Sequence, residues 1–162
     1  MQPEGPVGPK LDLLRLEAEA MPMGGTRHFA EAEFGGVFRD GRALIARRAR
    51  APWLGAFSLP GGVVEVGETL EAAAARELME EIGVEARDYR FVRHVEPIYH
   101  ESGRVKAHFV ICVFAAHWAA GEPGLSDEVD EIAWVDPRAL GVSHTTPELP
   151  DIVARAAAAL GL

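Results

Sequence analysis

The chain has 162 residues, of which 48% are hydrophobic and 25% are charged, and its formal net charge is −9. This size and composition exclude a largely disordered chain and favour one domain with a core of its own. The negative charge disfavours binding to a nucleic acid polymer, whereas a small phosphorylated ligand could still bind where metal ions reverse the local charge.

The single cysteine, Cys112, cannot form a disulfide within the chain. Its neighbours in Phe109–Phe114 are apolar, so we expect a packed thiol in a buried strand. No apolar run reaches the ~18 residues that crossing a bilayer requires. The first residues also lack the basic start and apolar centre of a secretion signal. These features predict a cytoplasmic protein with no membrane partner.

The first part of the chain divides into a tail and the start of a sheet. Residues 1–24 are predicted to be a tail, in which Lys10–Ala20 has the spacing of a short helix. Residues 25–162 are predicted to form a single domain. This domain begins with a strand at 32–38, a hairpin turn at Asp40-Gly41 and a second strand at 42–48.

The rest of the chain predicts further strands around two helices. One helix is expected to begin at Glu68-Thr69 and to end at Gly83, which suits a glycine cap. A short helical turn is expected at Asp136-Pro137, with the aspartate as N-cap. Further strands are predicted at 57–59, 89–96, 105–117 and 132–135, and a final alanine-rich helix at 146–160.

The predicted helix that ends at Gly83 carries three crowded carboxylates. Glu77, Glu80 and Glu81 fall within an arc of about 100° on one helix face. Like charges three and four residues apart destabilise a helix by a few tenths of a kcal/mol for each pair. The cluster therefore indicates ligands for a hard divalent cation such as Mg²⁺ or Mn²⁺, which prefer oxygen. The alternative is an acidic, solvated amphipathic helix.

The spacing of this segment resembles the Nudix box. Every defined position of the box is filled by Gly62, Glu68, Arg76-Glu77-Leu78, Glu80-Glu81-Ile82 and Gly83-Val84. The preceding Leu59-Pro60-Gly61-Gly62 is also typical of the family. The resemblance implies an α/β fold of the α+β kind, an α/β/α sandwich with a mixed sheet and a loop-helix-loop catalytic box. It also implies an enzyme that hydrolyses a nucleoside diphosphate linked to another group.

The resemblance also implies where a metal would bind. Pyrophosphate hydrolysis needs divalent cations that neutralise phosphate oxygens and activate a water molecule, so several carboxylates must be held at one place. We expect the metal ligands to be the side chains of Glu77, Glu80 and Glu81. By resemblance, the backbone carbonyl of Gly61 is a further ligand.

The catalytic set extends beyond the metal ligands. In the family, the arginine at the position of Arg76 orients a catalytic glutamate. Glu68 could hydrogen-bond the loop or reach the metals through water. A general base often lies outside the box, and Glu128 and Glu131, just before a late strand, are the candidates here. Glu77 is the competing base, and a solvated acidic loop is the alternative for the other two.

Substrate contacts are expected from the region before the box. Arg47, in the basic run at 47–50, could bind a phosphate bidentately or could be an edge-strand charge that prevents aggregation. Phe57 and Trp53 could stack on a base or pack in the core. Glycines, Gly62 among them, would let the chain turn tightly and approach the substrate.

The segment before the box and the box together are similar to short bacterial ADP-ribose pyrophosphatase-type members. Such members carry a proline past the box, and Pro97 lies near that place but somewhat early. The expected substrate is ADP-ribose or a related nucleotide sugar, and the alternative is a nucleoside triphosphate of the nucleotide pool. A nucleotide-sensing module is a third interpretation, although such modules commonly lose a box residue. The family often pairs two chains, so the predicted helix at 10–20 could form a homodimer.

Overall fold

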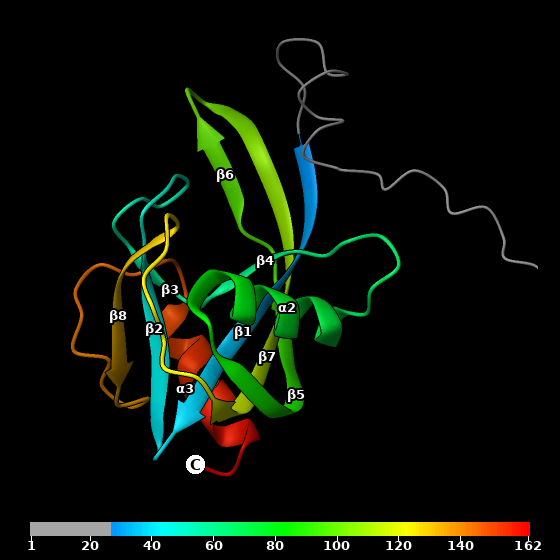
Figure 1. Ribbon diagram of the computed structural model, residues 1–162. Helices are drawn as coiled ribbons and strands as arrows, with labels where there is room; N and C mark the ends of the chain where they lie inside the picture. Colours follow the sequence, from blue (N-terminus) through cyan, green and yellow to red (C-terminus); the bar gives the residue numbers. More distant parts are fainter. Residues whose placement is uncertain (1–26) are drawn as a thin grey trace, which may run out of the picture.

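The computed structural model describes the backbone from Arg27 to Leu162 and the side chains from Gly36 onward (Figure 1). The predicted tail and its helix at 10–20 lie outside the described residues. The elements are β1 (Arg27–Arg39), β2 (Arg42–Arg48), β3 (Phe57–Ser58), β4 (Gly61–Val63), α2 (Leu70–Ile82), β5 (Glu85–Val95), β6 (Ile98–Glu101), β7 (Arg104–Ala120), β8 (Val129–Val135) and α3 (Leu149–Ala159).

The strands form one mixed sheet. Its main order is β3-β2-β1-β7-β5, while β4 pairs with β1, β6 with β7 and β8 with β2. The long β1–β7 pair is parallel, and the other pairs are antiparallel. The predicted hairpin is confirmed, because Asp40 and Gly41 both have positive φ and join β1 to β2.

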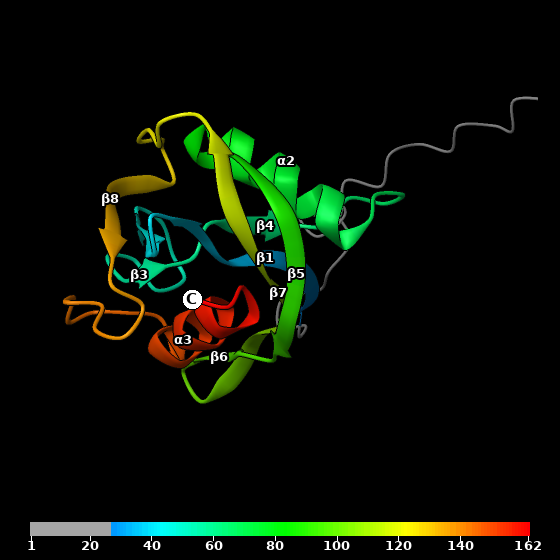
Figure 2. The ribbon, with the colours of Figure 1, turned by 90° about the horizontal axis from the view of Figure 1, so that it is seen from below.

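Two helices cover the sheet from opposite sides. Figure 2 shows α2 and α3 on either side of β1 and β7. A core on the α3 side includes Ile45, Ile111 and Leu149, and a second core on the α2 side includes Leu44, Leu78 and Phe114. Because β2 buries alternate residues in different cores, its sequence reads as a continuous apolar run. The predicted α/β/α sandwich with a mixed sheet is confirmed.

The predicted ends of the box helix agree with the structure. The Thr69 hydroxyl accepts a hydrogen bond from the Ala72 amide at 3.1 Å, which satisfies a free donor of the first turn. Gly83 takes a left-handed conformation with φ 74° and donates its amide to the Met79 carbonyl at 3.0 Å. Both caps fix the position of the helix face that carries the carboxylates.

Two other helix predictions were wrong in part. At Asp136-Pro137 the chain forms a turn, in which the Asp136 carboxylate accepts from the Arg138 amide at 2.8 Å, and no helix follows. The final helix begins at Leu149 and not at residue 146, because the Thr146 amide donates to the Phe57 carbonyl at 2.9 Å. Neither helix that the structure describes within residues 27–162 has the length and apolar content needed to cross a bilayer.

Candidate active site

Arg76 is the centre of the charge network on α2. Its guanidinium donates to both oxygens of Glu68, to Glu77 at 2.7 Å and to Glu80 at 3.1 Å. It also donates to the Val63 carbonyl of β4 at 3.0 Å. Hydrogen bonds to these carboxylates raise the pKa of Arg76 above its usual value, so it stays charged. One arginine thus joins the helix, the strand before it and the loop between them.

Glu68 has a structural role that the sequence left open. Besides its two bonds from Arg76, its carboxylate accepts from the Glu65 amide at 2.7 Å. Its side chain is 17% exposed. The loop between β4 and α2 is therefore closed on itself and fastened to the helix through Glu68.

The strand β4 lies directly against the carboxylates of α2. The Gly61 amide donates to Glu81 at 2.9 Å. At Gly62 a Cβ atom would overlap the carboxyl group of Glu77. The expectation of a tight turn at Gly62 was wrong, since this glycine lies in a strand paired with β1. Its missing side chain is needed for the close approach of a carboxylate and not for an unusual φ.

Among the carboxylates on α2, Glu81 has the pKa that burial changes most. Burial raises the pKa of the Glu81 carboxyl to about 7, and the hydrogen bond from the Gly61 amide opposes this only in part. The charges of Glu128 and Glu77 raise this pKa further, and the charge of Arg48 lowers it. Glu81 is therefore a half-buried carboxylate in a field that is net unfavourable for its negative charge.

Burial raises the pKa of Glu77 as well, although less than that of Glu81. Arg76 lowers the pKa of Glu77, and the charges of Glu80 and Glu128 raise it again. Both carboxylates that contact β4 thus have raised pKa values. A bound cation would reverse this effect, because an opposite charge within a few ångströms favours the ionised form.

The donor chemistry of α2 fits a hard divalent cation. Glu77, Glu80 and Glu81 supply carboxylate oxygens from one rigid helix. Among the described residues, however, no three acidic, histidine or cysteine side chains already surround one point. The carboxylates are engaged by Arg76 and by the Gly61 amide. Cation binding would therefore exchange some of these hydrogen bonds for metal ligation.

The two candidates for the general base outside the box, Glu128 and Glu131, have different neighbours. Glu128 is near enough to α2 for its charge to raise the pKa values of Glu77 and Glu81. Glu131 instead pairs with Arg47 at 2.5 Å. The structure thus brings Glu128, and not Glu131, to the carboxylate cluster.

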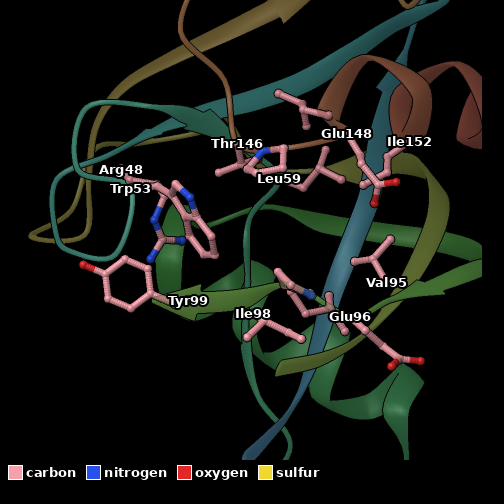
Figure 3. A pocket seen from close by; sticks show the side chains of 14 residues that line it. Arg48, Trp53, Leu59, Val95, Glu96, Ile98, Tyr99, Thr146, Glu148 and Ile152 are labelled. Carbon is pink, nitrogen blue, oxygen red and sulfur yellow. The ribbon is translucent and has the colours of Figure 1, made fainter. Parts of the chain in front are cut away.

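A pocket of about 380 Å³ opens on the α3 side of the sheet, where Leu59, Ile111 and Leu149 of the α3-side core line it (Figure 3). Arg48, Trp53 and Tyr99 gather at one end of it, and Glu96 and Glu148 lie toward the other. The Trp53 and Tyr99 rings meet edge to face with centroids 6.1 Å apart. The remaining lining residues are mainly apolar: Leu59, Val95, Pro97, Ile98, Ile111, Thr146, Pro147, Leu149 and Ile152.

Arg48, and not Arg47, lines the pocket, and its charge also lowers the pKa of Glu81. The Nε atom of Arg48 donates to the Pro52 carbonyl at 2.8 Å. Arg47 is engaged by Asp130 at 2.7 Å as well as by Glu131. The roles predicted for Arg47 in phosphate binding and for Phe57 in base stacking stay predictions, although Phe57 is only 8% exposed and packs in the α3-side core.

Tyr99 is a pocket residue that sequence reasoning missed. It lies in β6, which was not predicted. The sequence does contain a signal for this strand, because a Ser-Gly dipeptide such as Ser102-Gly103 is typical of turns. In the structure this dipeptide forms the turn between β6 and β7, with positive φ at both residues. A hairpin predicted there would have placed Tyr99 in a strand next to β7.

Comparisons with known proteins agree with this architecture. The model of the NUDIX domain matches residues 31–156. The chain is 34% identical over 110 residues to a Methanocaldococcus jannaschii protein named ADP-ribose pyrophosphatase, covering 67% of this chain and 63% of that one. It is 33% identical over 100 residues to a Danio rerio protein named oxidized purine nucleoside triphosphate hydrolase, covering 57% of this chain and 58% of that one.

The chain spans less than two thirds of the length of each of these two relatives. Among solved structures, a MutT NUDIX hydrolase from Burkholderia pseudomallei superposes with a TM-score of 0.70 at 29% identity. That match covers 80% of this chain and 98% of the other. Sequence, fold and site geometry lead to the same assignment, and the chain belongs to the Nudix family.

Proposed function

We propose that the chain hydrolyses the pyrophosphate bond of a nucleoside diphosphate derivative with the help of Mg²⁺ or Mn²⁺. The observation that carries this proposal is the contact of β4 with α2, where Gly61 binds Glu81 and Gly62 leaves room for Glu77. A cation bound by these carboxylates would neutralise phosphate oxygens, lower the pKa of a bound water and fix the direction of attack.

The residues of the site have different proposed roles. Glu77, Glu80 and Glu81 are the proposed cation ligands, with the Gly61 carbonyl as a backbone ligand. Arg76 and Glu68 hold the box loop and orient Glu77, as their shared hydrogen bonds support.

Glu128 is the general base that we favour over Glu77. Arg76 and Gly62 confine the Glu77 carboxylate. The Glu128 side chain is 54% exposed and its charge acts on Glu77 and Glu81, so a water molecule near the cluster can reach it and give up a proton. A base must come within hydrogen-bond reach of the proton that it removes, and a confined ligand is less able to do so.

The pocket suits the nucleoside end of the substrate. Trp53 and Tyr99 offer aromatic faces for a base, and Arg48 offers a guanidinium for a phosphate. Glu96 and Glu148 on the far side would accept hydrogen bonds from ribose hydroxyls and would repel a further phosphate chain. ADP-ribose or a related nucleotide sugar is therefore our first choice.

A nucleoside triphosphate of the nucleotide pool is the second candidate. It is supported by the relative named oxidized purine nucleoside triphosphate hydrolase, whose identity to this chain is close to that of the relative named ADP-ribose pyrophosphatase. A non-catalytic nucleotide-sensing role is less well supported, because every box position is filled.

A substrate panel tests the proposal. The protein is incubated with Mg²⁺ and with ADP-ribose, other nucleotide sugars, dinucleoside polyphosphates, NADH or deoxynucleoside triphosphates, and Glu81→Gln is the control. AMP and ribose 5-phosphate from ADP-ribose would support the first choice. A monophosphate and pyrophosphate formed only from a triphosphate would establish the second. Tight nucleotide binding with no product from any compound would refute hydrolysis and indicate a sensor.

The cytoplasmic location and the homodimer stay predictions. The helix expected at 10–20 could pair two chains, and light scattering at high protein concentration tests this. A mass of two chains would support the dimer, and a single-chain mass at all concentrations would exclude it.

A further inference from the structure

The loop between β2 and β3 connects the pocket with the acidic segment that precedes β8. Three backbone hydrogen bonds close the loop: Arg48 to Ala56 at 2.9 Å, Gly55 to Arg48 at 2.8 Å and Ala56 to Trp53 at 3.0 Å. Trp53 faces the pocket from this loop, and Arg50 extends from the same loop to the acidic segment. The loop is therefore a defined structure that presents two side chains to different parts of the site.

Arg50 holds the segment that carries Glu128. Its guanidinium donates to Glu128 at 3.2 Å and forms a second ion pair with Asp127. Next to it, the Ala49 amide donates to the Glu128 carbonyl at 2.8 Å. Glu128 is thus attached to one loop both through its backbone and through its side chain.

A β-bulge at Asp130 lies next to the segment that carries Glu128. Arg47 pairs with Glu131, but the next residue, Arg48, pairs with Val129, so that Asp130 is the extra residue on β8. A bulge re-aims the residues beyond it. Val129, the residue after Glu128, is buried in the α2-side core, and the Glu128 carbonyl accepts from the Ala49 amide.

We infer that Arg50 is a positioning residue, which keeps the Glu128 carboxylate at the α2 cluster by fastening the segment before β8 to the β2–β3 loop. This inference rests on the proposed function, in which Glu128 is the base. Exposed ion pairs add little to global stability. Positioning is more sensitive, because a displacement of about 1 Å in a reacting group can lower a rate by about 10²-fold.

Steady-state kinetics on the best substrate of the panel test this inference. Arg50→Gln should lower kcat about 10-fold and leave KM and the melting temperature nearly unchanged, and Arg50→Lys should restore most of the rate. The matched control is Arg87→Gln, since Arg87 is also exposed and pairs with the exposed Asp88, and neither residue lines the pocket. It should behave as the wild type does.

A double variant separates positioning from a general surface effect. In Glu128→Gln the added change Arg50→Gln should cost no further activity, because Arg50 acts through Glu128. If adding Arg50→Gln to Glu128→Gln lowered kcat by a further factor of about 10, the inference would be overturned. A wild-type kcat in Arg50→Gln alone would also overturn it.

Amide hydrogen exchange gives a readout that does not depend on turnover. Exchange of the Ala49 amide should become about 10-fold faster in Arg50→Gln and should stay unchanged in Arg87→Gln. Unchanged exchange in Arg50→Gln would show that Arg50 does not hold the segment, even if the enzyme is active. If the wild type hydrolyses nothing in the panel, the proposed function fails and the assignment of Arg50 fails with it.

Discussion

Two arginine–carboxylate clusters in this chain use the same residue types in different surroundings. The Arg76 side chain is 23% exposed, and its partners Glu68 and Glu77 are similarly covered. Arg50 and its partner Glu128 are each 54% exposed. The first cluster holds strand, loop and helix together, whereas the second holds one surface segment to another.

The difference teaches that burial, and not the number of acidic residues, distinguishes the proposed cation site from the exposed cluster. In water, exposed ion pairs are screened and contribute little. On α2, burial raises the pKa values of Glu77 and Glu81 even though Arg76 and the Gly61 amide stabilise their charges. A site that must receive a cation needs such uncompensated negative charge before the cation binds.

The largest effect should come from Glu81→Gln. This change removes a proposed ligand while keeping the shape of the side chain. We expect kcat/KM to fall on the order of 10³-fold, because the cation contributes several kcal/mol of charge stabilisation. Glu85→Gln, at an exposed position on β5, is the control and should leave kcat/KM unchanged. Equal kinetics of the two variants would show that α2 does not carry the chemistry.

The metal-free protein should lose stability as the pH rises from about 5 to about 8. The folded chain raises the pKa of Glu81 from 4.5 to about 7, so it keeps a proton that the unfolded chain has already released. Because the folded state binds more protons in this window, its stability falls with rising pH, by about 3 kcal/mol at most. Urea unfolding in a chelator measures the loss.

The variant Glu81→Gln isolates this contribution from those of other titrating groups. It should lack this part of the pH dependence, and Mg²⁺ at about pH 8 should restabilise the wild type far more than the variant. Identical pH curves for the two proteins would contradict the assigned burial of the Glu81 charge.

Arg76→Lys should weaken both stability and activity by an intermediate amount. A lysine cannot span Glu68, Glu77 and the Val63 carbonyl at once, so several charge-assisted hydrogen bonds are lost. We expect a loss of about 2 kcal/mol in the free energy of unfolding, with a clear drop in kcat. Arg87→Lys should change neither quantity, because Arg87 and its partner Asp88 are both exposed. A similar response of both arginines would remove the contrast between buried and exposed clusters.

The smallest effect is expected at the pocket. Trp53→Ala should raise KM about 10-fold with a lesser change in kcat, since base stacking on an aromatic ring contributes about 1–3 kcal/mol. Trp53→Phe should retain much of the affinity. Leu54→Ala alters a neighbouring exposed residue outside the pocket lining and serves as the control. A KM unaffected by Trp53→Ala would show that the nucleobase of the substrate binds elsewhere.

The box cluster could be predicted from the sequence because its residues are local. Glu77, Glu80 and Glu81 share one helix, and helical geometry alone brings them to one face. The caps Thr69 and Gly83 were also readable, since capping depends on residues within one turn.

The pocket could not be predicted in the same way. Its lining comes from separate segments around Arg48, Tyr99, Ile111 and Leu149, which only the sheet topology brings together. Sequence periodicity also could not choose between Arg47 and Arg48, because β2 is buried on both faces.

The most direct test of the central claim is a titration of Mn²⁺ into the metal-free protein, followed through the paramagnetic signal of the free ion. We expect the wild type and Glu85→Gln to bind Mn²⁺ saturably and to release it to excess Mg²⁺. Glu81→Gln should require at least about 10-fold more Mn²⁺, because it lacks a carboxylate ligand. Equal binding by Glu81→Gln and the wild type, or no binding by the wild type, would contradict a cation site on α2.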